Sequence, residues 1–146
     1  MTLLIPNLFR LLKLNNNSFV VIDRDGKTIS VKLNDTKTRI QNELGENKTW
    51  ITKGREIENY ISNDALQKWL QNDYSIRCVF DNESNKKLED NITKIGKQTE
   101  KIKYNLNKNK YANDIVKHID NNNFENLDLK LNLENLISTI KKWNKI

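Results

Sequence analysis

The sequence has few of the residues that cross-link a chain or interrupt its secondary structure. Its 146 residues include one cysteine, one proline and four glycines. A single cysteine, Cys78, excludes an intrachain disulfide and favours an intracellular, cytoplasmic location. No apolar run reaches the ~20 residues that a membrane span requires, so we expect no membrane partner. The sequence also lacks a Gly-x-x-x-x-Gly-Lys phosphate loop and a cysteine–histidine cluster with zinc spacing.

Charged and polar residues dominate what the sequence does contain. Charged residues make up 30% of the chain and hydrophobic residues 36%, so one modest core is expected. The length suits a single domain. The net charge of +6 is compatible with a polyanionic partner, although lysine-rich surfaces also keep many proteins soluble. Asparagine and lysine occur in runs throughout the chain, which is typical of a compositional bias of the source.

Two carboxylates follow a short apolar run near the start of the chain. Phe19 to Ile22 form that run, which is typical of a short strand buried on both faces. Asp23 and Asp25 come directly after it, at the strand end where open α/β sheets place their ligands. Because two unpaired carboxylates repel each other, the pair suggests a divalent cation.

A β-hairpin is the alternative interpretation of the same stretch. Asp25 and Gly26 form an Asp-Gly pair, which is a strong short-range signal for a hairpin turn. Ile29 to Leu33 alternate between apolar and polar residues, as an outgoing hairpin strand would. The two interpretations differ in one testable way, because only the hairpin pairs residues 29–33 with residues 19–22.

Alternating strand and helix signals predict an α/β domain. Short strands are expected at 19–22, 48–52 and 77–80. Helices are expected at about 4–14, 34–44, 111–119 and 133–143, and Gly45 would end the second of these. A further helix is expected to begin at a cap formed by Asp64. The charged stretch 83–105 is expected to be a solvated helix broken at Gly96. Residues 1–82 would then form a short, mostly parallel sheet flanked by helices, and residues 83–146 a helical C-terminal part of the same domain.

A second pair of acidic residues repeats the arrangement of the first. Glu56 and Glu58 are two residues apart and follow the strand that carries Trp50. If both strands are parallel, their C-terminal ends share one sheet edge, and four carboxylates could converge on one or two cations. Mg²⁺ and Mn²⁺ prefer such oxygen ligands. The alternative is that residues 55–58 form an exposed charged turn.

The two motifs together resemble a known family. Val-Val-Ile-Asp-Arg-Asp at 20–25, followed by Trp-Ile-Thr-Lys-Gly-Arg-Glu-Ile-Glu-Asn-Tyr-Ile at 50–61, is similar to the C-terminal Toprim domain of OLD-family (overcoming lysogenization defect) ATP-dependent nucleases and related AAA-ATPase-linked proteins. The resemblance spans about residues 4–70. It extends more loosely to Asn-Lys-Asn-Lys-Tyr-Ala at 107–112. It implies a partial Toprim-like fold.

The resemblance also implies an activity and the residues that carry it. The activity would be hydrolysis of DNA phosphodiester bonds with Mg²⁺ or Mn²⁺, in which one cation activates water and another stabilises the leaving oxygen. The implied metal ligands are Asp23, Asp25, Glu56 and Glu58. Of the two glutamates, Glu58 is the better match and Glu56 would assist. The implied lysine, which offsets charge near the scissile phosphate, is Lys108, with Lys110 as the second choice.

Two parts of the family pattern have no counterpart in this sequence. The family's fold opens with a strand that carries a glutamate ligand, and an ATPase domain with a phosphate loop precedes it. We therefore expect the chain to be the C-terminal portion of a larger nuclease that works with those upstream parts or with a partner ATPase chain. The alternatives are a non-catalytic nucleic-acid-binding module and a partner-docking domain, and a homodimer is also possible.

Overall fold

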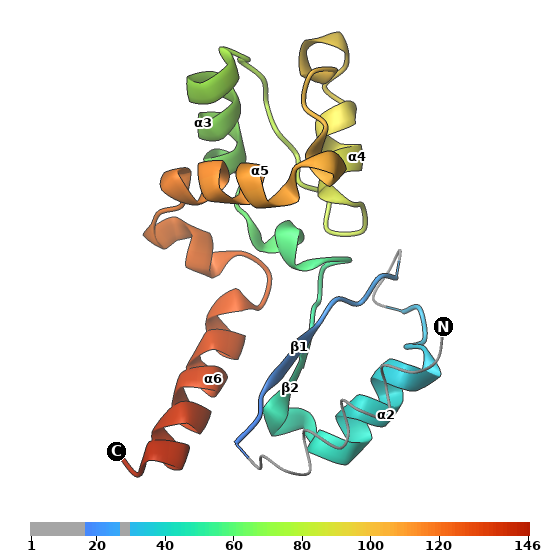
Figure 1. Ribbon diagram of the computed structural model, residues 1–146, viewed down its shortest axis with the longest axis vertical. Helices are drawn as coiled ribbons and strands as arrows, with labels where there is room; N and C mark the ends of the chain where they lie inside the picture. Colours follow the sequence, from blue (N-terminus) through green and yellow to red (C-terminus); the bar gives the residue numbers. More distant parts are fainter. Residues whose placement is uncertain (1–16, 27–29) are drawn as a thin grey trace.

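The structure is a computed structural model that describes residues 17–26 and 30–146. Its strands and α-helices are β1 (Val20–Ile22), α2 (Asp35–Leu44), β2 (Thr49–Ile51), α3 (Asn63–Tyr74), α4 (Leu88–Thr93), α5 (Lys108–Ile115) and α6 (Leu129–Asn144). Short 3-10 helices connect them: η1 (Glu46–Lys48), η2 (Ile57–Tyr60), η3 (Lys97–Thr99), η4 (Tyr104–Leu106), η5 (Val116–His118) and η6 (Asn121–Glu125). Figure 1 shows an elongated molecule in which α2 and α6 flank the strands in one half and α3, α4 and α5 form the other half. The helix expected at 4–14 lies outside the described residues.

The two strands form a parallel sheet, as the α/β interpretation predicts. Val20 pairs with Thr49, Val21 with Trp50, and Ile22 with Ile51. Residues 30–33, the described part of the alternative hairpin strand, lie in no strand. The strand that pairs with β1 is therefore β2 and not a returning hairpin strand at 30–33. The residues after both strands leave the sheet at the same edge.

The prediction of a strand at 77–80 is wrong. Phe80 is buried, but residues 77–80 have no strand pairing. Side chains of α3 take the place of a neighbouring strand, because the Phe80 N–H donates to Gln67 Oε1 at 2.8 Å and the Asn82 N–H donates to Asn63 Oδ1 at 2.8 Å. Phe80 is thus buried from a loop that packs against a helix, whereas Val79 in the same stretch is 92% exposed.

Local capping signals set the bounds of α2 and α3. The Asn34 side chain accepts the Lys37 N–H at 2.9 Å, and Gly45, with φ +83°, ends α2 where the sequence predicts. The cap expected at Asp64 is wrong by two residues, because the Ser62 hydroxyl accepts the Ala65 N–H and begins α3. Either side chain can act as an N-cap, so the sequence alone does not choose between them.

The hydrophobic core lies between α3, α4 and α5, and it joins both halves of the sequence. Its buried members are Leu66, Trp69, Leu70, Ile76, Phe80, Leu88, Ile92, Ile102, Tyr104, Tyr111 and Ile115. The expectation of a solvated helix over 83–105 is wrong, because α4 is only six residues long and buries Leu88 and Ile92. Leu88, Ile92 and Ile102 enter the core, whereas Leu106 is 78% exposed. No helix in the described part of the chain is long and apolar enough to cross a membrane.

Candidate functional site

The loops that follow β1 and β2 run together beyond the strands. The Thr52 N–H donates to Ile22 O at 3.0 Å, and the Asp25 N–H donates to Arg55 O at 2.7 Å. These bonds bring Asp23 to the segment after β2, where its Oδ1 accepts the Ile57 N–H at 2.7 Å. Two loops that are about 30 residues apart in sequence are thus fixed side by side at one end of the sheet.

Glu56 sits at the start of η2 and is 8% exposed. Its Oε1 accepts the Leu88 N–H at 2.7 Å, which attaches η2 to the first turn of α4. Its own N–H donates to Asn59 Oδ1 at 2.9 Å. The alternative of an exposed charged turn is therefore wrong for Glu56, since the fold holds this carboxylate inside the molecule.

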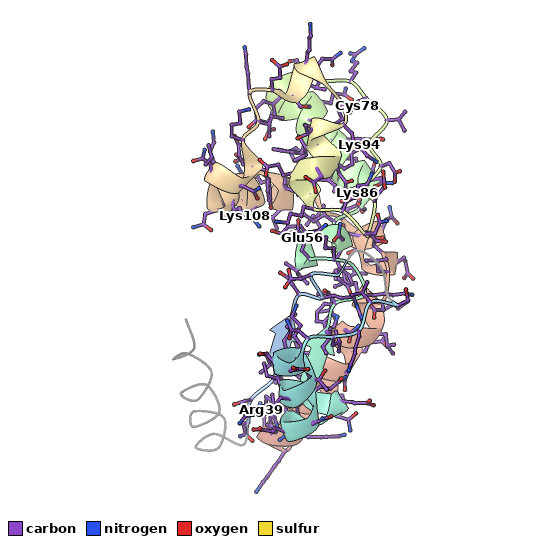
Figure 2. The ribbon with its side chains drawn as sticks, turned by 90° about the vertical axis from the view of Figure 1, so that its right-hand side faces the viewer. Arg39, Glu56, Cys78, Lys86, Lys94 and Lys108 are labelled. Carbon is purple, nitrogen blue, oxygen red and sulfur yellow. The ribbon has the colours of Figure 1, made fainter. Side chains whose placement is uncertain are left out.

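Lys108 reaches the same place from α5. Its Nζ lies 3.1 Å from Glu58 Oε1 and 5.7 Å from the centroid of the Tyr104 ring. Lys110 instead lies over the Tyr111 ring at 5.8 Å and forms no ion pair with a described carboxylate. Figure 2 shows Lys108 and Glu56 in the middle of the molecule. Of the two lysines suggested by the sequence, the fold brings only Lys108 to the acidic residues.

Asp23, Glu56 and Glu58 together form what we call the carboxylate cluster. Burial raises the pKa of Asp23; the Ile57 N–H opposes this shift, and the charges of Glu58 and Asp25 add to it. Burial also raises the pKa of Glu56, against the Leu88 N–H and with the help of Glu58. The carboxylates of the cluster are therefore close enough to interact electrostatically. The single ammonium of Lys108 does not balance their three negative charges.

Lys108 responds to the cluster as its counter-ion. Burial alone would lower the pKa of its ammonium. The hydrogen bond to Glu58 and the charges of Glu58, Glu56 and Asp23 outweigh burial, and the pKa is raised. Lys108 is therefore held in its charged form beside the carboxylates.

Asp25 has a different partner from the rest of the predicted ligands. Its Oδ2 lies 2.7 Å from Lys37 Nζ, which also donates to Asp23 O at 2.5 Å and to Arg24 O at 2.9 Å. Asp25 has φ +59°, and Lys37 is only 7% exposed. Lys37 thus holds the loop after β1 in place. Sequence reasoning missed it, because nothing in the local sequence separates this lysine from the many others.

The donors of the cluster suit a hard divalent cation in kind. Carboxylate oxygens are the ligands that Mg²⁺ and Mn²⁺ prefer. Asp23 Oδ2 and Glu58 Oε2 receive no hydrogen bond from a described residue, so each carboxylate retains one oxygen for a ligand. Within residues 17–26 and 30–146, no group of three or more histidine, cysteine, aspartate or glutamate side chains is arranged closely enough to hold a metal as it stands.

Comparisons with other proteins add no family to this geometry. No family model, no curated protein and no solved structure matches the chain. The Toprim resemblance therefore continues to rest on the two sequence motifs, and the function has to be argued from the carboxylate cluster.

Asparagines hold the cluster to the rest of the fold, and sequence reasoning missed them too. Asn59 is 1% exposed and its Nδ2 donates to Glu83 O at 3.1 Å and Lys86 O at 2.9 Å. Asn123 is also buried; its Nδ2 donates to Tyr60 O at 3.1 Å and its Oδ1 accepts the Ser62 N–H at 2.6 Å. Because asparagine is abundant everywhere in the sequence, these buried members carry no distinguishing signal.

The raised pKa of Glu56 gives stability a predictable dependence on pH. A carboxyl group with a raised pKa binds its proton more tightly in the folded state than in the unfolded state. The contribution of Glu56 to the free energy of unfolding is therefore fully present below its ordinary pKa of 4.5. It is lost as the pH rises through the raised pKa of Glu56 in the folded state. We expect Glu56→Gln, which keeps Oε1 for the Leu88 N–H, to gain stability relative to the wild type as the pH rises from 4 to 7.

Urea unfolding of both proteins across this pH range measures the effect. The exposed Glu100 supplies the matched control, since Glu100→Gln is expected to follow the wild-type curve. A Glu56→Gln protein that falls below the wild type at pH 7 would show that the charge of Glu56 stabilises the fold, contrary to this prediction.

Proposed function

We propose that the chain is the Toprim-type part of a metal-dependent nuclease that hydrolyses DNA phosphodiester bonds. It would act in the cytoplasm with an ATPase supplied by upstream parts or by a partner chain. One observation carries the proposal: Asp23, Glu56 and Glu58 gather at the shared end of two parallel strands, with Lys108 of a distant helix beside them. These four residues belong to the set that the motifs single out, which also includes Asp25 and Lys110.

Each residue of the cluster has a distinct role in the proposal. Asp23 and Glu58 would offer their free oxygens to Mg²⁺ or Mn²⁺, and Glu56 would assist from its buried position. The cations, when bound, supply an activated water and stabilisation of the leaving oxygen. Asp25 would act mainly by keeping Lys37 in place. Lys108 would offset negative charge on the phosphate that enters the site.

A second candidate function is supported by the contact between Lys108 and Glu58. The ammonium lies 3.1 Å from Glu58 Oε1 and already neutralises part of the negative charge that a metal would bind. A chain in which this ion pair persists would hold nucleic acid without cutting it. Its affinity for DNA would be sensitive to salt and indifferent to the carboxylates.

The double variant Asp23→Asn with Glu58→Gln tests the proposal. Losing a single outer-shell partner of a metal typically costs 10–100-fold in affinity, so removing two direct ligands is expected to weaken Mn²⁺ binding by at least about 100-fold. Isothermal titration calorimetry measures the affinity, and nicking of supercoiled DNA in Mn²⁺ measures the activity of the same preparations.

The matched control removes two carboxylates elsewhere. Glu100 and Glu134 are both exposed, and Glu100→Gln with Glu134→Gln is expected to bind Mn²⁺ as the wild type does. Equal Mn²⁺ affinity in the wild type and the Asp23/Glu58 variant would refute the metal site. If the wild type and the Asp23/Glu58 variant bind DNA equally well and the wild type does not nick it, the result would favour the second candidate function, DNA binding without cleavage.

A further inference from the structure

A basic pocket lies beside the carboxylate cluster. It has a volume of about 450 Å³ and is lined by Arg55, Asn85, Lys86, Asp90 and Lys94. Figure 2 shows Lys86 and Lys94 in the same half of the molecule as Lys108, with Arg39 near the opposite end. We call these lining residues the basic pocket. No part of the predicted nuclease chemistry uses them.

Arg55 is the feature of this pocket that points to a ligand. Its Nε–H is buried and has no hydrogen-bond partner among the described residues. A buried donor without a partner costs free energy, and such groups in folded proteins usually bind an ion or water. The backbone of Arg55 is fixed, since its N–H donates to Ser84 O at 2.7 Å and its carbonyl accepts the Asp25 N–H at 2.7 Å. The backbone that carries the guanidinium is thus fixed beside the pocket, and no ion pair joins the guanidinium to an acidic side chain within residues 17–26 and 30–146.

The charges around Arg55 favour an anion. Lys86 lies 3.1 Å from Glu83 Oε2, and Lys94 forms an ion pair with the same glutamate. Among the residues that line the pocket, Arg55, Lys86 and Lys94 are basic and Asp90 is acidic. The lining therefore carries more positive than negative charge, although Glu83 pairs with both lysines. A planar guanidinium flanked by lysines suits a phosphate group.

The position of the pocket identifies the phosphate. Arg55 directly precedes Glu56 in the chain, and the segment that carries Lys86 continues to Leu88, whose N–H is bonded to Glu56. We propose that the basic pocket binds a backbone phosphate of the nucleic-acid strand whose neighbouring phosphodiester lies at the carboxylate cluster. The identity of the strand rests on the proposed nuclease function. The preference for a phosphate rests on Arg55 and its neighbours.

Fluorescence anisotropy with a labelled DNA duplex tests this assignment. The assay contains EDTA, so that neither metal binding nor cleavage contributes. Arg55→Gln is expected to weaken binding about 5–10-fold at low salt and to reduce the slope of log affinity against log salt by about 1. Arg39→Gln removes the same charge from the exposed surface of α2 and is expected to change the affinity less than 2-fold.

A second variant protects the test from misfolding of Arg55→Gln. Lys86 is partly exposed, and Lys86→Gln leaves Glu83 paired with Lys94, so this protein is expected to fold and also to show the smaller salt slope. Wild-type slopes in both Arg55→Gln and Lys86→Gln would overturn the proposal. So would Arg55-dependent calorimetric binding of inorganic phosphate combined with Arg55-independent binding of DNA, because the pocket would then take free phosphate.

The result is separable from that of the nuclease test. Loss of DNA affinity in Arg55→Gln supports the pocket even if no cleavage is ever seen. Conversely, metal binding that depends on Asp23 and Glu58 supports the nuclease even if Arg55→Gln binds DNA normally. The two proposals therefore fail independently.

Discussion

Replacing Asn59 with alanine is expected to destabilise the protein by about 3–5 kcal/mol and to abolish cation binding. The substitution leaves two groups without a partner among the described residues, the Glu56 N–H and Lys86 O. It also removes one of the bonds to Glu83 O, which still accepts from the Asn91 side chain and the Lys86 N–H. Each unsatisfied buried group costs about 1–3 kcal/mol. The same bonds join η2 to the loop before α4, so their loss would also free Glu56 and Glu58 to move apart.

Urea unfolding measures the stability of Asn59→Ala, and calorimetry with Mn²⁺ measures its binding. Asn72→Ala is the matched control, because Asn72 is exposed on α3 and its loss is expected to stay within about 0.5 kcal/mol. An Asn59→Ala protein as stable as this control would mean that water replaces the asparagine at both the Glu56 N–H and Lys86 O. The network would then not be what holds the cluster.

The second large effect is expected at Trp69, which is fully buried between α3 and α5. Its ring meets Tyr74 at 5.5 Å and Tyr111 at 5.8 Å between centroids, both edge to face. Trp69→Ala is expected to cost about 3–5 kcal/mol, as large aromatic truncations in cores do. Because Tyr111 belongs to the helix that begins at Lys108, the cavity would also loosen the ammonium beside Glu58.

Two variants make this prediction specific. Trp143 is only partly buried on α6, so Trp143→Ala is expected to lose clearly less stability than Trp69→Ala in the same urea titration. Trp69→Phe keeps an aromatic ring and removes the buried indole N–H that has no described partner, so it is expected to recover much of the loss. Equal stability of Trp69→Ala and Trp143→Ala would place the core elsewhere.

Local signals in the sequence were enough to predict the sheet edge that carries the carboxylate cluster. The apolar runs at β1 and β2, a cap at Asn34 or Asp35 and the stop at Gly45 each depend on a few neighbouring residues, and these elements formed where expected. The expectation that β1 is buried on both faces is wrong, because Val21 is 46% exposed. Two parallel strands must present their C-terminal ends at one edge. The convergence of Asp23 with the Glu56–Glu58 segment follows from that geometry.

Other features depended on contacts between distant residues. The stretch 77–80 resembles a strand in sequence, but its Phe80 N–H donates to Gln67 of α3, and the nearby Asn82 N–H donates to Asn63 of the same helix. The charged stretch 83–105 is typical of a solvated helix in sequence, but α4 within it packs into the core. Neither outcome is visible in a local window, because the deciding partner lies elsewhere in the chain.

The sequence by itself therefore determined β1, β2, α2 and the acidic edge, because capping, turn formation and side-chain alternation are local. Only the tertiary structure decided which charged groups meet. It paired Lys108 with Glu58 while Lys110 lies over Tyr111, and it turned Asp25 toward Lys37. The physical reason is that a charge is stabilised by the nearest opposite charge or oxygen in space, and distances across the fold are set by packing of the core.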